Sequence, residues 1–146
     1  MDNLYLLDTN VLVHLLRCDR VGLLIQRRYD PLMIEPRPLI SVVTAGELRS
    51  LAYQFRWGDK KREQAVFLLN YFRQTSIDNP DIIEAYAVID AFSVRVGRSI
   101  GKNDLWIAAS AKIARATLLT TDRDFDHLDP QFIARMWVPT EESDRP

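Results

Sequence analysis

The sequence has few of the features that a secreted or membrane-bound protein needs. Cys18 is the only cysteine among 146 residues, so no disulfide can form within the chain and no zinc cluster can be built from thiolates alone. No stretch reaches the roughly 18 apolar residues of a membrane span, and Met1-Asp2-Asn3 lacks the basic start of a signal peptide. We therefore expect a soluble protein in a reducing cytoplasm, with no contact to a membrane.

An excess of positive charge is also absent, since the net charge is −1, and this argues against a protein that coats nucleic acid nonspecifically. Arginine nevertheless makes up 15 of the 19 cationic residues, and arginine binds phosphate in a bidentate manner. Histidine is scarce: His14 lies in an apolar helical stretch and His127 in an acidic loop. An acid–base mechanism that uses a histidine pair is therefore not expected.

Short apolar runs alternate with helical patterns along the chain. The patterns predict strands at 4–7, 39–41, 75–77, 117–120 and 132–138, and helices at 11–16, 22–29, 42–53, 60–72, 82–96 and 105–116. The expected helix caps are Thr9 or Asn10, Asp59, Asn79 and Asn103. Because neighbouring parallel strands need crossover connections, this order predicts an α/β fold, a three-layer α/β/α sandwich with a central parallel sheet. We expect a single domain over residues 1–139 and a flexible tail over 140–146.

Four acidic residues fall where a parallel sheet gathers its ligands. Asp8 and Asp122 follow predicted strands, Glu47 lies on the helix after a strand, and Asp104 opens a helix. Clustered carboxylates repel one another unless a cation neutralises them, and Mg²⁺ or Mn²⁺ prefers such oxygen ligands. A cation of this kind can activate water against a phosphodiester, which predicts 5′-phosphate and 3′-hydroxyl products.

Each acid also has a purely structural explanation. Asp8 could cap the helix that follows it, Asp104 could complement a helix dipole, and Asp122 and Asp124 could be turn residues. Glu47 is the hardest to explain in this way, because it interrupts a small, apolar helix face.

Four short motifs contain these acids: Leu7-Asp8-Thr9-Asn10-Val11-Leu12, then residues 40–48 (ISVVTAGEL), residues 103–109 (NDLWIAA) and residues 119–125 (LTTDRDF). In order, spacing and context they resemble the PIN-domain nucleases, and most closely the VapC-type toxins of toxin–antitoxin pairs. The resemblance implies Asp8, Glu47, Asp104 and Asp122 as catalytic metal ligands, Asp124 as a possible further ligand, and Thr9, Asn10 and Thr121 as supporting residues. Asp126 is expected to be peripheral. The family pattern leaves open whether Asp122 or Asp124 is the main fourth ligand, and we favour Asp122 because it is nearer the strand end.

The same resemblance implies an endoribonuclease with an RNA substrate and a homodimeric state. It also implies a small antitoxin that lays a helix in an apolar groove, for which the helices at 11–29 and 55–72 are candidates, and that pushes a basic residue into the acid pocket. The aromatic and basic residues of 53–62 could grip single-stranded RNA or could form a solvated helix–helix turn.

Three alternatives share part of the pattern. A PIN-domain nuclease for RNA maturation or DNA processing would have the same four acids. A phosphatase of the haloacid-dehalogenase type needs a second aspartate two residues after Asp8, where Asn10 stands. A receiver-like or degenerate binding module would hold an ion without catalysis, but the paired acids that a receiver needs after its first strand are absent from the sequence.

Overall fold

The computed structural model describes residues 3–140 and contains one five-stranded sheet. The strands are β1 (Tyr5–Leu7), β2 (Leu39–Ser41), β3 (Arg73–Thr75), β4 (Thr117–Thr120) and β5 (Ala134–Trp137). They lie in the order β3-β2-β1-β4-β5, and every neighbouring pair is parallel. The predicted parallel sheet is therefore confirmed.

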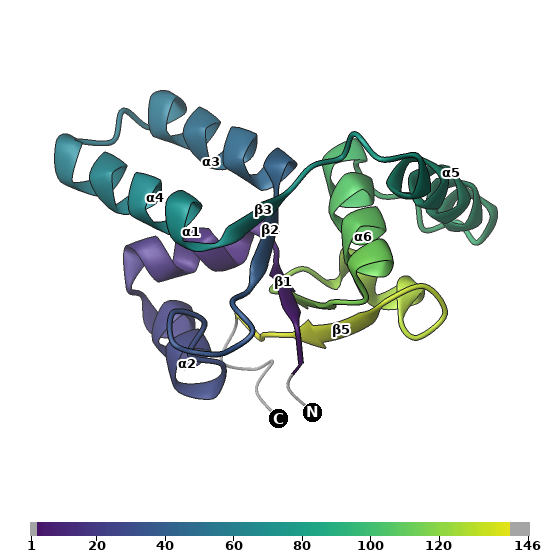
Figure 1. Cartoon of the computed structure of the whole chain (residues 1–146), viewed down its shortest axis with the longest axis horizontal. Coiled ribbons are helices and arrows are strands. Elements are labelled where there is room, and N and C mark those ends of the chain that lie inside the picture. The colour runs from purple at the N-terminus through teal and green to yellow at the C-terminus, as the bar shows by residue number, and fades with distance from the viewer. Residues whose placement is uncertain (1–2, 141–146) are drawn as a thin grey trace.

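Helices cover both faces of this sheet. They are α1 (Thr9–Arg17), α2 (Arg20–Arg28), α3 (Val42–Gln54), α4 (Asp59–Tyr71), α5 (Pro80–Arg95) and α6 (Lys102–Ala114), with a 3₁₀ helix, η1, at Arg123–Leu128. Figure 1 shows α1 to α4 on one side of the strands and α5 and α6 on the other. This is the predicted three-layer sandwich. Among the described residues, no helix combines the length and the apolar character that crossing a bilayer requires.

The central strand β1 contributes side chains to both layers. Leu7 packs with the core residues of α1 to α4, whereas Leu6 packs with those of α5 and α6. Both leucines are fully buried, and they pair with Leu119 and Leu118 of β4. A strand covered on both faces needs apolar residues without alternation, which is why this run could be recognised in the sequence.

Several helix starts differ from the prediction. Asp8, and not Thr9 or Asn10, caps α1, because its side chain accepts a hydrogen bond from the amide of Thr9. The N-caps of α4 and α6 are glycines without a side-chain cap, so the expected caps Asp59 and Asn103 lie inside the first turns of these helices. The remaining expected cap, Asn79, is confirmed at the start of α5.

Two other boundaries also moved. The strand expected at 75–77 lies at Arg73–Thr75 in β3, an edge strand whose first two residues are exposed. An edge strand buries too little side-chain surface to leave a clear apolar pattern. The loop expected after β4 contains η1, whose first residues are capped by Asp122. The predicted tail at 140–146 lies outside the described residues except for Thr140.

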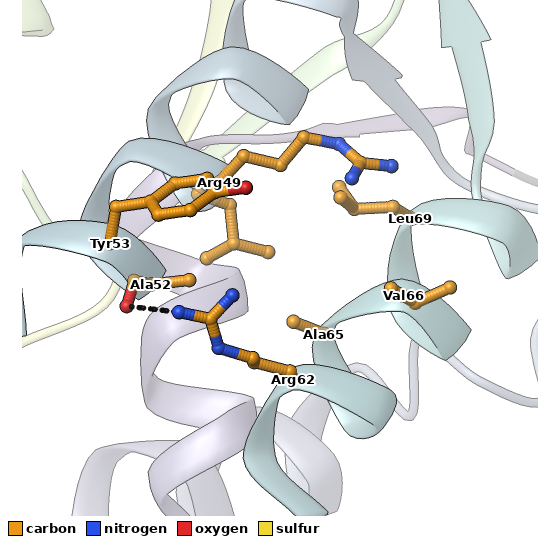
Figure 2. A pocket seen from close by; sticks show the side chains of 8 residues that line it. Arg49, Ala52, Tyr53, Arg62, Ala65, Val66 and Leu69 are labelled. Atoms are coloured by element: carbon orange, nitrogen blue, oxygen red, sulfur yellow. Dashed lines mark hydrogen bonds between the residues drawn. The ribbon is translucent and has the colours of Figure 1, made fainter. Parts of the chain in front are cut away.

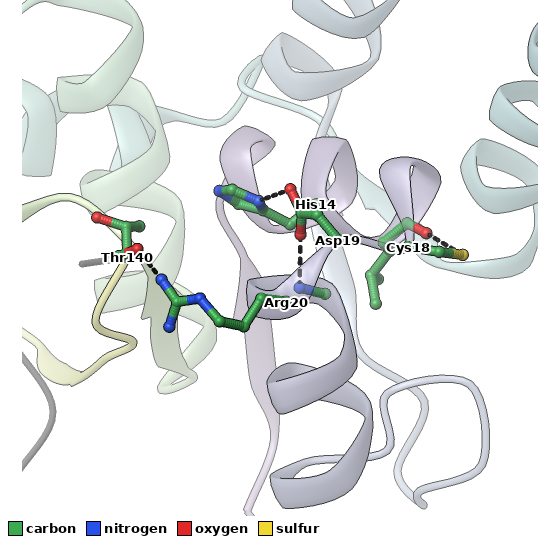
Figure 3. Close-up of polar contacts among 7 residues, drawn as sticks. His14, Cys18, Asp19, Arg20 and Thr140 are labelled. Atoms are coloured by element: carbon green, nitrogen blue, oxygen red, sulfur yellow. Dashed lines mark hydrogen bonds and ion pairs between the residues drawn. The ribbon is translucent and has the colours of Figure 1, made fainter. Parts of the chain in front are cut away.

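The corner between α1 and α2 is held by Asp19, as Figure 3 shows. Its Oδ1 accepts a hydrogen bond from the amide of Gly22 at 2.8 Å, and its Oδ2 lies 2.8 Å from Nδ1 of His14. The guanidinium of Arg20 donates to the carbonyl of Thr140, which fastens the end of the described chain to α2. His14 therefore has a structural partner in this corner.

The close approach of α1 and α2 predicts a specific cost for a side chain at position 22. A Cβ atom on Gly22 would lie 2.2 Å from the carbonyl oxygen of His14, so the two helices would have to separate. We expect Gly22→Ala to lower the free energy of unfolding by about 1 to 3 kcal/mol. Gly46→Ala is the matched control, because nothing lies within 4 Å of a Cβ there, and it should raise stability by about 0.5 to 1 kcal/mol. Urea unfolding measures both, and equal stability of the two variants would contradict the prediction.

Candidate active site

The acids singled out from the sequence converge on the carboxyl edge of the sheet. Asp8 directly follows β1, and Asp122 lies two residues beyond the end of β4. Glu47 is on α3, which begins immediately after β2, and Asp104 is in the first turn of α6. Four segments that are far apart in the sequence therefore meet at one edge.

Asp8 is fixed by hydrogen bonds to β4 and to the start of α1. Its side chain is buried, and the residue as a whole is only 3% exposed. Oδ2 accepts a hydrogen bond from the hydroxyl of Thr120 at 2.7 Å, and Oδ1 accepts one from the amide of Thr9 at 2.8 Å. The backbone amide of Asp8 donates to the carbonyl of Leu119 at 3.0 Å. The carboxylate therefore has one orientation set by β1, β4 and α1.

Glu47 is linked to the same strand end through Thr9. The Thr9 hydroxyl donates to Oε1 of Glu47 at 2.7 Å, and it also lies 3.0 Å from the hydroxyl of Thr44. Because a hydroxyl donates a single proton, Thr44 must donate to Thr9. The expected supporting role of Thr9 thus has a concrete geometry, and Thr44 extends it into α3.

Asp104, Asp122 and Asp124 form a tighter group, which we call the acidic trio. One carboxylate oxygen from each lies within 4.8 Å of the others. The Thr120 hydroxyl accepts a hydrogen bond from the amide of Asp122 at 3.0 Å, and Oδ1 of Asp122 accepts one from the amide of Asp124 at 2.8 Å. Thr120 therefore connects the trio to Asp8, and both Asp122 and Asp124 reach the group.

An open cavity lies beside Asp8, Glu47 and one member of the trio, Asp104. It has a volume of about 430 Å³, and its lining includes Asp8, Glu47 and Asp104. The exposed side chain of Asn10 and that of Asn103 add amide groups to the wall. Asn10 thus lies at the site, although no hydrogen bond from its side chain is recorded among the described residues.

The electrostatics of the site indicate uncompensated negative charge. Burial raises the pKa of Asp8 to about 6, although the hydrogen bonds from Thr120 and Thr9 oppose this shift. Burial also raises the pKa of Asp104 to about 7, and the charges of Asp8, Asp122, Glu47 and Asp124 add to it in that order. A bound cation would reverse these shifts, and a cluster of carboxylate oxygens is the donor set that hard divalent ions take.

The other titratable residues near this edge have different partners. Asp126 is paired with Arg135 at 3.2 Å. Nε2 of His127 lies 2.8 Å from the hydroxyl of Ser93, a contact between η1 and α5. The side chain of His127 is therefore engaged in packing η1 against α5.

The structure also identifies residues that sequence reasoning missed. Thr121 was the expected supporting hydroxyl after β4, but its recorded contact is through its carbonyl, which accepts from Nε1 of Trp137 at 3.2 Å. The hydroxyl that contacts Asp8 belongs to Thr120, the last residue of β4. The alternation of side chains gives a signal for this contact. Leu7 and Leu119 are buried neighbours in the sheet, and because successive strand residues face opposite sides, the next residues, Asp8 and Thr120, lie together on the other face.

The aromatic and basic residues of 53–62, which run from the end of α3 into α4, contact their own chain. The Nε of Arg62 donates to the carbonyl of Trp57 at 2.8 Å. Figure 2 shows its second contact, in which a terminal nitrogen of Arg62 donates to the carbonyl of Ala52 at 3.4 Å. Lys61 lies 4.3 Å from the ring centroid of Trp57, and Arg62 lies 5.0 Å from that of Tyr53. These contacts favour the helix–helix turn over the RNA grip as the reason for this composition.

Comparison with known proteins agrees with this architecture. Ribonuclease VapC1 of Haemophilus influenzae strain R2866 is 32% identical over 120 residues, which cover 80% of this chain and 85% of the relative. Ribonuclease VapC1 of strain KW20 / Rd is 31% identical over the same shares.

Solved structures match over nearly the whole chain. VapBC-1 from nontypeable Haemophilus influenzae has a TM-score of 0.75 at 25% identity, covering 92% of this chain and 97% of that one. FitAcB from Neisseria gonorrhoeae has a TM-score of 0.70 at 28% identity, with 91% and 96% covered. VapBC2 from Rickettsia felis, bound to a promoter DNA fragment, shares the fold with a TM-score of 0.77 at 19% identity, with 92% and 98% covered.

The model of the PIN domain family matches residues 5–130. That span contains all the acids described above and extends from β1 to the end of η1. The chain therefore belongs to the PIN-domain family.

Proposed function

We propose that this chain is a metal-dependent endoribonuclease that acts as the toxin of a toxin–antitoxin pair. The observation that carries the proposal is the convergence of acids from four separate segments on one edge of the sheet. Two further findings support it: the curated relatives are named ribonucleases, and the matching structures include VapBC complexes. The substrate is RNA, and the reaction is hydrolysis of a phosphodiester bond.

In this proposal Asp8, Glu47, Asp104 and Asp122 are the catalytic metal ligands, and Asp124 is a further ligand. Their oxygens suit Mg²⁺ or Mn²⁺, because these ions prefer carboxylates and keep several waters. The bound cation would activate a water for attack and neutralise charge on the phosphate in the transition state.

The remaining residues of the chain position these carboxylates. Thr120 orients Asp8 and the start of η1, while Thr9 orients Glu47. Asn10 and Asn103 offer amides to the substrate at the cavity wall. Since His14 and His127 are held by Asp19 and Ser93, we expect 5′-phosphate and 3′-hydroxyl products and no cyclic phosphate.

The proposed antitoxin partner fits an apolar cavity between α1, α2 and α4. This cavity of about 240 Å³ is lined by residues of α1, α2 and α4, including Leu15, Leu16 and Phe67. Phe67 is 59% exposed at this cavity and stacks on the ring of Tyr71 at a centroid distance of 6.1 Å. We propose that a helix of the antitoxin packs there, in a cytoplasmic complex in which the single domain of residues 1–139 also forms homodimers.

The nuclease proposal predicts metal-dependent cleavage that requires the converging acids. Purified chain, freed of antitoxin, should cut total RNA in Mg²⁺ or Mn²⁺, and Glu47→Gln should lower the rate by about 100-fold or more through loss of a ligand. Glu84→Gln, a change of the same kind on the exposed face of α5, should leave the rate unchanged. Mapping the cut ends by sequencing checks the products. Wild-type protein that is inactive with every divalent ion, or a 2′,3′-cyclic phosphate at the cut, would refute the proposal.

The raised pKa values predict how stability depends on pH without metal. In the folded chain the pKa of Asp8 is about 6 and that of Asp104 is about 7, whereas the ordinary value for an unfolded chain is 3.8. The folded state therefore binds more protons than the unfolded state between pH 4 and pH 7. In EDTA their contribution to stability is therefore complete below pH 4 and is lost as the pH rises to 7. Above pH 7, Asp104→Asn should stabilise the metal-free protein by about 1 kcal/mol, a discounted value for a partly exposed group.

Metal should invert this comparison. In excess Mg²⁺ at pH 7.5 the wild type should gain stability, whereas Asp104→Asn should gain less because it has lost a ligand. Thermal unfolding of both proteins across pH, with and without Mg²⁺, measures the difference. A variant that is less stable than the wild type in EDTA would show that the charge of Asp104 is already compensated.

The partner proposal predicts that antitoxin binding and nuclease activity can be separated. Phe67→Glu should weaken the complex with the proposed antitoxin by about 100-fold, as expected for a central aromatic contact, and should leave RNA cleavage intact. Phe55→Glu is the control, since Phe55 is 66% exposed but does not line the cavity. Isothermal titration gives both affinities. Equal losses in the two variants would exclude this cavity as the docking site.

A further inference from the structure

A second open cavity shares Asp124 with the acidic trio. Its volume is about 420 Å³, and it is lined by Arg98, Ser99 and Ile100 from the loop after α5 and by Arg123, Asp124 and Asp126 from η1. Because the carboxylate of Asp124 also lies within 4.8 Å of those of Asp104 and Asp122, a ligand in this cavity would lie next to the acids. The volume falls within the range of sites that hold small ligands.

The charges in this cavity favour an anion. Asp126 is paired with Arg135 and Asp124 belongs to the trio, so the cationic groups of this wall are the guanidinium groups of Arg98 and Arg123. Among residues 3–140, the side chain of Arg98 makes no hydrogen bond or ion pair. Its positive charge is nevertheless felt nearby, since burial first and Arg98 second lower the pKa of His127.

The two arginines are carried by segments whose relative position is fixed. The amide of Arg98 donates to the carbonyl of Ser93 at 2.8 Å, and Gly97, two residues after the end of α5, has a φ of 74° that favours glycine. The hydroxyl of Ser93 contacts His127 of η1 at 2.8 Å. On η1 itself, the guanidinium of Arg123 lies 4.1 Å from the ring centroid of Trp137. The cavity wall is therefore held together by packing rather than by chance proximity of two loops.

The cavity on the Asp8 side has the opposite character. Its wall consists of acids, hydroxyls, amides and one leucine, with no lysine or arginine. An RNA strand that lies across the acids carries a phosphate on each side of the bond to be cut, and guanidinium groups are the preferred partners of phosphate. Of these two cavities, only the one at Arg98 is lined by guanidinium groups, so the two directions along the strand are not equivalent.

We propose that Arg98 and Arg123 form a subsite for the RNA phosphate adjacent to the one that is cut, and that this subsite sets the direction of the strand across the acids. The inference rests on the proposed function, and it adds a binding site outside the carboxylates. It identifies the ligand as a backbone phosphate of single-stranded RNA, independent of base sequence.

The test measures RNA binding one phosphate at a time. A fluorescent RNA octamer that spans a cut site mapped for the wild type is titrated with Glu47→Gln protein, alone or combined with Arg98→Gln, in Mg²⁺. Arg98→Gln should weaken binding about tenfold and reduce the salt dependence of log Kd by about 0.7, the value for one phosphate contact on a single strand. Arg27→Gln, the same change at an exposed position of α2, should leave both quantities within about twofold.

Neutral methylphosphonates then locate the contact. Replacing the phosphate that occupies the subsite should weaken RNA binding to the Glu47→Gln protein. The same replacement should have no further effect on the double variant Glu47→Gln/Arg98→Gln, which has already lost the contact. Replacing any other phosphate should weaken RNA binding to the two proteins equally. Arg123→Gln should lose sensitivity at the same phosphate, which gives a second measurement if one variant folds poorly.

The unfavourable outcomes are distinguishable. If the wild type cuts RNA but Arg98→Gln behaves like Arg27→Gln, the subsite is refuted and the nuclease proposal stands. If Arg98→Gln weakens antitoxin binding and leaves RNA binding unchanged, the cavity belongs to a protein partner and the inference is again refuted. If the wild type neither binds nor cuts RNA in any divalent ion, both proposals fail together.

Discussion

The buried carboxylate of Asp8 lies between the ends of two parallel strands, and the hydroxyl of Thr120 joins it to the second of them. One oxygen of Thr120 donates to Asp8 at 2.7 Å and accepts from the amide of Asp122 at 3.0 Å. The registers of β1 and β4 make this contact possible, since Leu7 pairs with Leu119 and places the next residues side by side. The packing of leucines in the sheet therefore determines the distance between the acids.

This arrangement is costly for the folded chain in the absence of a cation. Burial disfavours the ionised forms of Asp8 and Asp104, and the neighbouring carboxylates add repulsion at Asp104. Hydrogen bonds from Thr120 and Thr9 recover part of the cost at Asp8. Residues that served stability alone would not be arranged in this way, because an apolar side chain of similar size would fit a buried strand end at lower cost.

Much of the fold could be predicted because the sheet is buried on both faces. The runs at 39–41 and 117–120 became β2 and β4 with the predicted bounds. The exposed edge strand β3 was displaced, since no burial pattern marks its ends. Helix caps were predicted less well: Asp8 both caps α1 and faces the site, so the structural and functional explanations of this residue are true together.

The candidate site could be predicted at the level of its acids but not of their supports. The order and spacing of the four motifs predicted which acids would lie at one edge of the sheet. The contacts of Thr120 with Asp8 and of Thr44 with Thr9 depend on side-chain geometry, which cannot be predicted from spacing in the sequence. The same limit applies to the choice between Asp122 and Asp124. Both belong to the trio because η1 begins immediately after Asp122, and the sequence predicted a turn or loop here but no 3₁₀ helix.

The contrast between the two cavities explains how a chain with a net charge of −1 can bind a polyanion. Without a cation, the acids repel the phosphate that must lie over them, and two arginines on one side cannot offset several carboxylates. With the acids neutralised, the same arginines attract the neighbouring phosphate at short range, where screening by salt is weak. Metal binding and RNA binding are therefore coupled by electrostatics, and each should increase the affinity of the site for the other, as linkage between two ligands requires.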